Sequence, residues 1–233
     1  MNKNSISTTR CSTHRHREFV LVFDTSIPQG DVVVLASFLE ESVEKGVRYE
    51  HGEIISFGSM LLRVAALDDS FTLQEPDTQS VLIAWRLGVT QSMMLLRLQK
   101  DITESVGLVD EMDAPSIGSS LLVGTDIPQG GDEFILERAN PMGADSGWFV
   151  GCPDTLVNYN DESNLMRISV YQAILNWPRI APFLALPPGC RIDLLRANTL
   201  FTRSGSPLEI KPRSLVEAFT KQNTSHPANS SQQ

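Results

Sequence analysis

The chain has 233 residues, 41% of them hydrophobic, which is enough for one large or two small domains with buried cores. It contains no run of about 18 apolar residues and its N-terminus lacks the apolar stretch of a secretory signal, so we expect no membrane partner and a cytoplasmic location. The formal charge is −9; residues 1–17 carry +4 and residues 205–233 carry +1, so the body, residues 18–204, carries −14.

The acidic body limits the possible partners. It would repel phosphate backbones, so nucleic acid is not an expected partner. It would attract a basic protein and accelerate the encounter. Acidic proteins are also common for reasons of solubility, so charge alone does not decide the function.

The first half of the chain predicts an N-terminal α+β domain. Residues 1–17 are polar and basic with almost no apolar side chains, and we expect a disordered tail. Residues 18–110 alternate strand-like and helix-like patterns and predict the domain. The elements expected in it are a strand at 18–24, a helix from Asp31, its predicted cap, to about Lys45, three meander strands at 53–66, 70–74 and 80–86, and a helix at 88–105.

The second half predicts another small α+β unit. The acidic, proline-containing segment 108–117 is the expected domain boundary, and the unit spans residues 118–204. Residues 205–233 are expected to be mostly disordered, although 212–221 has the pattern of a few helical turns. The fold class is therefore α+β, with two small units of mainly antiparallel strands. Its elements are strands at 119–123, 133–138, 147–150 and 191–195, a loop at 156–165, and a helix from Ser169 to Asn176, which Pro178 ends.

No residue pattern predicts catalysis. The sequence has no nucleophile elbow, phosphate-binding glycine loop or zinc-protease helix. Cys152 would need a histidine base, and the one histidine in the predicted folded body, His51, lies in a polar loop. Cysteines and histidines are not at metal-ligand spacing. We expect no catalytic residue, no cofactor and no metal.

A polar loop after residue 150 is the segment most suited to recognising a partner. Such a loop between rigid elements is a frequent recognition site, and an aromatic flanked by acids suits a basic partner. Tyr159 either serves as an exposed anchor or pins its own loop, and the sequence leaves both open. The candidate residues for binding that partner are Asp154, Asn158, Tyr159, Asn160, Asp161 and Glu162.

Residues 137–193 resemble a family of predicted immunity proteins from bacterial polymorphic toxin systems, the thirty-third class in that scheme. The match covers about a quarter of the chain, and its motifs are individually weak but occur in order. They are Asp145-Ser146-Gly147-Trp148, Gly151 with Asp154, and Asn164, followed by Ile168–Tyr171, Ile174, Ile180–Leu184 and Leu186–Gly189. The family's densely acidic loop is diluted here, and residues 18–117 lie outside the motif.

The resemblance implies a cytoplasmic protein that protects a toxin-producing cell by binding the cognate toxin or effector directly. It carries over no catalytic residue, because the family is understood as inhibitory. The alternative is a non-catalytic ligand-binding or effector-loading accessory protein of a secretion system. An adjacent toxin gene would distinguish the two.

Overall fold

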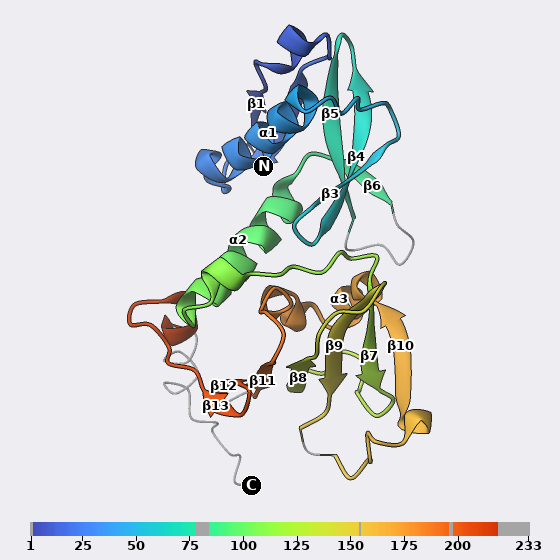
Figure 1. Ribbon diagram of the computed structural model, residues 1–233, viewed down its shortest axis with the longest axis vertical. Helices are drawn as coiled ribbons and strands as arrows, with labels where there is room; N and C mark the ends of the chain where they lie inside the picture. The colour runs from blue at the N-terminus through green and yellow to red at the C-terminus, as the bar shows by residue number, and fades with distance from the viewer. Residues whose placement is uncertain (1, 78–83, 154, 196–197, 219–233) are drawn as a thin grey trace, which may run out of the picture. The chain divides into compact units, whose positions relative to one another are not determined.

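The computed structural model describes residues 2–77, 84–153, 155–195 and 198–218, and it divides into two compact units, Met1–Arg97 and Leu98–Gln233 (Figure 1). Each unit is built on a mixed, mostly antiparallel sheet, so the predicted α+β class is confirmed. The division falls inside the helix α2, Thr90–Ser105, and not in the 108–117 segment that the sequence suggested. Met93 belongs to the core of the first unit, whereas the Gln99 amide donates to the Ala181 carbonyl in the second.

The first unit contains a six-stranded sheet of order β1-β2-β5-β4-β3, with β6 beside β5. All neighbours are antiparallel except β2 and β5. Of the expected 80–86 strand, Trp85 and Arg86 lie in β6, and residues 80–83 lie outside the described part. The strands are β1 Lys3–Ser7, β2 Phe19–Asp24, β3 Ile54–Phe57, β4 Met60–Leu67, β5 Ser70–Pro76 and β6 Trp85–Leu87.

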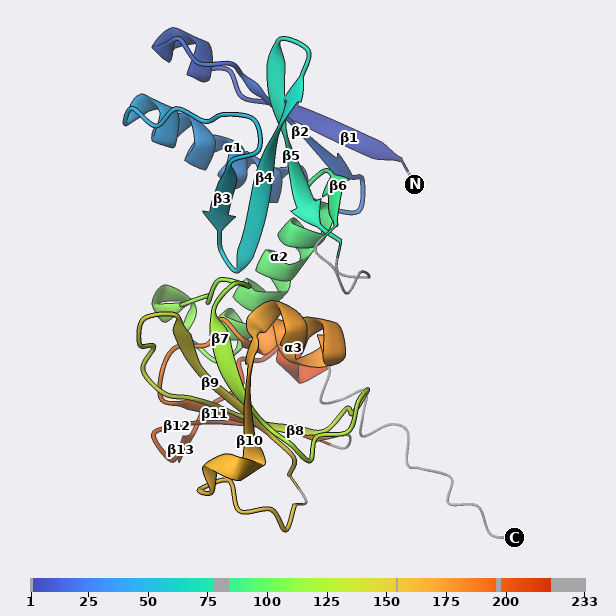
Figure 2. The same ribbon diagram turned by 90° about the vertical axis from the view of Figure 1, so that its right-hand side faces the viewer.

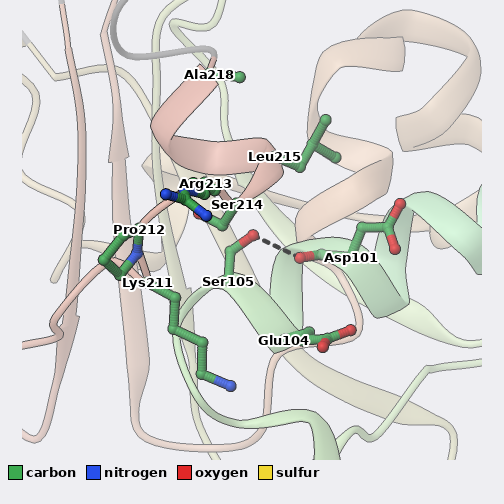
Figure 3. A pocket seen from close by; sticks show the side chains of 9 residues that line it. All are labelled: Asp101, Glu104, Ser105, Lys211, Pro212, Arg213, Ser214, Leu215 and Ala218. Carbon is green, nitrogen blue, oxygen red and sulfur yellow. Dashed lines mark hydrogen bonds between the residues drawn. The ribbon is translucent and has the colours of Figure 1, made fainter.

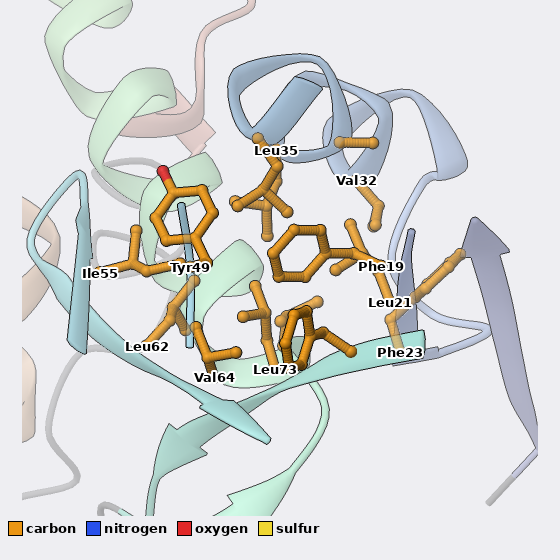
Figure 4. Close-up of a cluster of buried hydrophobic side chains, with 14 of the residues drawn as sticks. Phe19, Leu21, Phe23, Val32, Leu35, Tyr49, Ile55, Leu62, Val64 and Leu73 are labelled. Atoms are coloured by element: carbon orange, nitrogen blue, oxygen red, sulfur yellow. The ribbon is translucent and has the colours of Figure 1, made fainter. Parts of the chain in front are cut away.

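Helix α1, Gln29–Glu44, packs its apolar side against one face of this sheet (Figure 4). Val32, Leu35, Leu39 and Val43 recur at helical spacing and are fully buried. The sheet supplies alternate residues of its central strands. The helix begins earlier than expected, at Gln29 with Pro28 as N-cap, so Asp31 is not the cap. The other labelled members of the core are Phe19, Leu21, Phe23, Tyr49, Ile55, Leu62, Val64 and Leu73.

The prediction that residues 1–17 are disordered is wrong. β1 pairs with β2 over five residues, and the short helix η1, Cys11–His14, follows it. This segment has few apolar side chains, and hydrogen bonds to two carboxylates, the buried Glu40 and the half-buried Glu18, attach it to the rest of the unit. Glu40 accepts the backbone N–H groups of Thr9 and Arg10 at 2.7 and 3.1 Å, and Glu18 accepts the Thr8 hydroxyl at 2.5 Å.

The second unit contains a seven-stranded sheet of order β10-β7-β9-β8-β11-β12-β13, in which only β7 and β9 are parallel (Figure 2). The unit also holds the second half of α2, helical residues 215–218 and the short helices η2 Val109–Glu111, η3 Glu162–Asn164, α3 Val170–Asn176 and η4 Pro178–Phe183. The strands are β7 Ser120–Gly124, β8 Phe134–Arg138, β9 Asp145–Gly151, β10 Leu165–Ser169, β11 Cys190–Leu194, β12 Thr199–Arg203 and β13 Ser206–Pro207.

Helices α3 and η4 supply side chains to the buried face of this sheet. The expected N-cap of α3 is confirmed, because the Ser169 hydroxyl accepts the N–H of Gln172 at 3.1 Å. Trp177 meets Phe134 edge-on, and Phe183 packs on Phe201. The strand residues that face this core are Leu121, Val123, Phe134, Leu136, Trp148, Val150, Ile192, Leu194 and Phe201.

The segment after residue 204 is attached to the second unit over its described part. Residues 206–207 form β13, the N–H of Lys211 donates to the Ser105 carbonyl at 2.8 Å, and Val216 is 2% exposed. The expected disorder is therefore wrong for residues 205–218, and 219–233 lie outside the described residues. In the described chain, every helix is too short or too polar to cross a membrane.

Candidate functional site

The predicted recognition loop joins β9 to β10, and Tyr159 holds it in place. The Tyr159 hydroxyl donates to Asp126 Oδ1 at 2.8 Å and accepts the N–H of Cys152 at 2.8 Å. The Thr155 hydroxyl donates to the other oxygen of Asp126. The ring of Tyr159 meets Phe149 edge-on, with the centroids 5.1 Å apart. Burial raises the pKa of Tyr159, and the adjacent Asp126 carboxylate adds to this rise.

Two glycines form the seat for the Tyr159 ring. A Cβ atom on Gly124 would stand 2.6 Å from the ring, and one on Gly151 would stand 2.9 Å from it. Both positions end neighbouring parallel strands, β7 and β9. Of the two alternatives for Tyr159, the geometry therefore favours the one in which it pins its own loop. The seat also gives a structural reason for Gly151 of the family motif.

The rest of the loop is a compact turn that presents acids to solvent. Asp161 accepts both the N–H and the hydroxyl of Ser163, at 3.0 and 2.7 Å, and these bonds lower the pKa of its carboxyl group. The Asn164 amide donates to the Asn158 carbonyl at 3.0 Å, and Asn158 Oδ1 accepts the N–H of Asn160 at 3.1 Å. Asn158, Asn160, Asp161 and Glu162 are exposed, whereas Asp154 lies outside the described residues.

Leu156 is the most exposed large apolar side chain of the described chain, at 106% of its reference area. It stands beside the Tyr159 seat in sequence, between Thr155 and the turn. Leu156 was not among the residues predicted from the sequence, although an apolar residue within a polar loop is a signal that could have indicated it. Together with Asp161 and Glu162 it gives the loop both apolar and anionic groups for a partner.

The motif Asp145-Ser146-Gly147-Trp148 forms the first part of β9, and its side chains bond within the second unit. Asp145 accepts the N–H of Gly147 at 2.8 Å and pairs with Arg167 of β10. The buried Ser146 hydroxyl donates to the Ser120 carbonyl of β7 at 2.8 Å. Gly147 has φ +77°, and a Cβ there would lie 2.2 Å from the Ala139 carbonyl oxygen. This position within β9 requires glycine.

Trp148 connects the two halves of the family motif. It is 1% exposed, and its Nε1–H donates to the Leu184 carbonyl at 2.9 Å. The Arg138 guanidinium lies 5.5 Å from the centre of its ring and pairs with Asp113 at 2.9 Å. Burial lowers the pKa of Arg138, and Asp113 partly offsets this. Arg138 was not predicted from the sequence, because its partners are distant in the chain.

The outer face of the second sheet, opposite α3, carries a shallow hollow of about 410 Å³. The register places Phe149, Glu137, Arg191 and Thr202 in one row across β9, β8, β11 and β12. Arg191 bonds to Glu137 at 2.5 Å and to Asp193 at 2.9 Å, so its charge is balanced within the row. Phe149 extends the row to the Tyr159 seat. The loop and this face therefore form one continuous surface of the second unit.

A second hollow of about 500 Å³ lies between the end of α2 and residues 211–218 (Figure 3). Ser105 at its base donates to the Asp101 carbonyl at 2.6 Å. Its rim mixes Asp101 and Glu104 with Lys211 and Arg213, with no nucleophile and base held together among them. Across the described residues, no group of three His, Cys, Asp or Glu side chains is placed to hold a metal ion.

Comparison with known families gave a match within the second unit. The family model of the Imm33-like domain matches residues 98–199. The match begins one residue after the division between the units and runs through β7 to β11, which confirms the family resemblance of residues 137–193 and extends it. The comparisons with curated proteins and with solved structures gave no match.

Proposed function

We propose that this protein, whose second unit carries an Imm33-like domain, is an immunity protein that neutralises a cognate toxin or effector by direct binding. The match over residues 98–199 carries the proposal. Proteins of such families generally inhibit and do not catalyse, so we propose a non-enzymatic role. We place the protein in the cytoplasm of a toxin-producing bacterium, which it would protect from the toxin during competition between bacteria. Type VI secretion is the route that we propose for the toxin.

The loop at 155–164 and the adjoining outer sheet face are the surface we propose for the toxin. The Tyr159 seat fixes the loop before binding, which reduces the entropy lost on association. Acids outnumber cations there, which favours a basic toxin surface and faster association. The charged groups of this surface are Asp126, Glu137, Asp145, Asp161, Glu162 and Asp193 against Arg167 and Arg191.

Within this surface we assign different roles to the exposed side chains. Within the part of the chain that the structure describes, neither Asp161 nor Glu162 pairs with a cation, so both are available to steer a basic partner. Leu156, being fully exposed, supplies apolar area that a partner would bury. Steering charges affect the association rate, while buried contacts affect the dissociation rate.

The test is co-expression with the product of a neighbouring toxin gene, followed by growth rescue and binding kinetics. We expect Asp161→Lys with Glu162→Lys to slow association, more at low salt than at high salt, because screening extends over about 10 Å at 0.1 M. Leu156→Asp should accelerate dissociation. The matched control is Glu41→Lys with Glu44→Lys on α1, which makes the same charge change in the first unit.

Two outcomes would contradict the proposal. Binding and rescue by both loop variants equal to the parent would remove the loop from the interface. The absence of binding to any neighbouring toxin, together with binding of a small molecule or an effector under export, would favour the accessory-protein alternative.

A further inference from the structure

The outer face of the first sheet, opposite α1, is unusually apolar for a sheet face that the described residues of this unit leave open to solvent. Residues of an antiparallel sheet that face solvent are ordinarily polar. Along β4, Leu62 and Val64 point into the core and are fully buried, so Leu61 and Arg63 point to the other side. The pairing register sets Ile54, Arg63, Gln74 and Leu87 in one row. The outer patch consists of Ile54, Leu61, Arg63, Gln74, Trp85 and Leu87.

Large apolar side chains of the outer patch are open to solvent. Ile54 is 46% exposed and Leu87 is 47% exposed. Leu61 and Trp85 are half-buried. Scattered single apolar residues on a surface need no explanation, but a contiguous group marks an interaction surface. Trp and Arg are also the residue types most enriched at the centres of protein interfaces.

Arg63 stands at the centre of the outer patch in a fixed position. Its guanidinium lies 4.9 Å from the centre of the Trp85 ring, and its Nε and Nη2 donate to Gln74 Oε1 at 2.8 and 2.6 Å. Both partners are neutral, and no carboxylate of the described residues pairs with Arg63. Of the five N–H donors of a guanidinium, these bonds use two. The remaining N–H groups are oriented but lack an anionic partner within the described chain.

We propose that the outer patch is a docking surface for a protein segment that presents a carboxylate between apolar side chains. The carboxylate pairs with Arg63, whose stacking and bonding to Gln74 hold the planar donor group ready. The apolar side chains of the segment cover Ile54 and Leu87 on either side of it in the row. This partner is distinct in chemistry from the basic toxin assigned to the second unit.

A second copy of this chain, docked patch to patch about a two-fold axis, fits less well. In such an interface the same surface meets itself, which brings two like charges from Arg63 close together without an acid in the patch to compensate. A segment of opposite charge meets no such repulsion. Self-association is therefore an outcome to be tested and not the expected one.

The test uses the full chain and a soluble ten-residue peptide in which Glu alternates with Leu, with a Lys–Leu peptide of equal apolar content as the comparison. Trp148 and Trp177 are 1% and 5% exposed, so quenching and shifts of tryptophan emission on binding report mainly on Trp85. Amide chemical shifts locate the contact residue by residue. We expect the Glu–Leu peptide to bind at least about tenfold more tightly and to perturb Ile54, Arg63 and Leu87.

Two variants separate the charge contact from folding. Arg63→Met keeps the stem over Trp85 and should remove the preference for the Glu–Leu peptide, while Arg48→Met, an exposed arginine of the same unit, should leave it unchanged. Leu87→Ser should weaken the binding of both peptides without disturbing folding, because Leu87 is half-exposed and lies outside the core. Equal binding of the two peptides, shifts that map elsewhere, or a dimer in sedimentation that Arg63→Met dissociates would each overturn the proposal.

Discussion

Replacing Tyr159 with Phe is the sharpest test of how the loop at 155–164 is held. The substitution keeps the ring in the Gly124–Gly151 seat and removes only the hydroxyl. Two hydrogen bonds disappear, one of them to the Asp126 carboxylate, and the Cys152 N–H loses its acceptor. A neutral hydrogen bond contributes about 0.5–1.5 kcal/mol and one to a charged group about 1.5–3 kcal/mol. Because the site is half-buried, we expect the second unit to lose about 1–3 kcal/mol.

Hydrogen exchange of the Cys152 amide measures this loss where it occurs. A local loss of about 1.4 kcal/mol corresponds to a tenfold faster exchange, so we expect the rate to rise by about tenfold or more. Tyr49→Phe in the first unit is the matched control, since no hydrogen bond to the Tyr49 hydroxyl occurs within the described residues. It should leave the exchange at Cys152 unchanged.

The opposite result would reverse the assignment of Tyr159. If Tyr159→Phe leaves exchange at Cys152 and the unfolding free energy as in the parent, but accelerates toxin dissociation, the hydroxyl contacts the partner directly. The loop would then be held by Thr155 and the turn around Asp161, and the seat would have no positioning role.

The remaining predictions concern stability. Deleting residues 2–9 should destabilise the first unit by at least about 2 kcal/mol in urea denaturation, because each lost hydrogen bond contributes roughly 1 kcal/mol, and an unchanged midpoint would show that β1 is dispensable. Burial alone would raise the pKa of the Glu40 carboxyl group. The hydrogen bonds from Thr9 and Arg10 outweigh that effect and lower the pKa from its ordinary value of 4.5. Its stabilisation is therefore present above about pH 4.5 and lost in acid, so that Glu40→Gln should cost stability at neutral pH and progressively less below it; a constant difference would contradict this. Gly147→Ala should destabilise the second unit by about 1–3 kcal/mol from its backbone conformation alone, and further through a clash with Ala139. Gly143→Ala is the control, because Gly143 has a similar φ but open space around it, so the difference between the two losses measures the clash. Equal losses would show that there is no clash.

Apolar periodicity was a reliable guide to elements that bury one face. Helices α1, α2 and α3 and strands β2, β8 and β11 were all predicted near their observed bounds for this reason. β1 was missed because its sequence, KNSIS, has little to bury, and what attaches it is its pairing with β2 and the carboxylates of Glu18 and Glu40. Edge strand β10 was missed because Met166 and Arg167, which point to opposite faces of the strand, are both exposed, so no alternating apolar pattern marks it.

The domain boundary could not be predicted from composition. The sequence pattern of α2 is that of one continuous helix, yet its first residues join the core of one unit and its last residues join the other. Polarity, proline and charge pointed to 108–117, which is instead attached to the second unit, since the Asp113 N–H donates to the Ala185 carbonyl at 3.0 Å. A shared helix leaves no compositional mark of the division.

The acids and asparagines of the loop at 155–164 predict a recognition segment, and this stays a prediction, whereas the structural role of Tyr159 could not be predicted. The partners of Tyr159 are Asp126, 33 residues earlier, and two glycines that end separate strands. Only the pairing of β7 with β9 brings these together. Contacts set by strand topology are not visible in local patterns.

The structure separates residues that build the Imm33-like unit from residues that are free to contact a partner. Ser146 and Trp148 make hydrogen bonds inside the unit, and Gly147 adopts a backbone conformation within β9 that favours glycine. Substitution of any of the three should therefore lower stability. Leu156 and Glu162 have no such commitment and face solvent, so their substitution should alter binding kinetics at unchanged stability. If the proposed function and this separation both hold, the exposed loop can vary between relatives while the residues that build the unit stay the same.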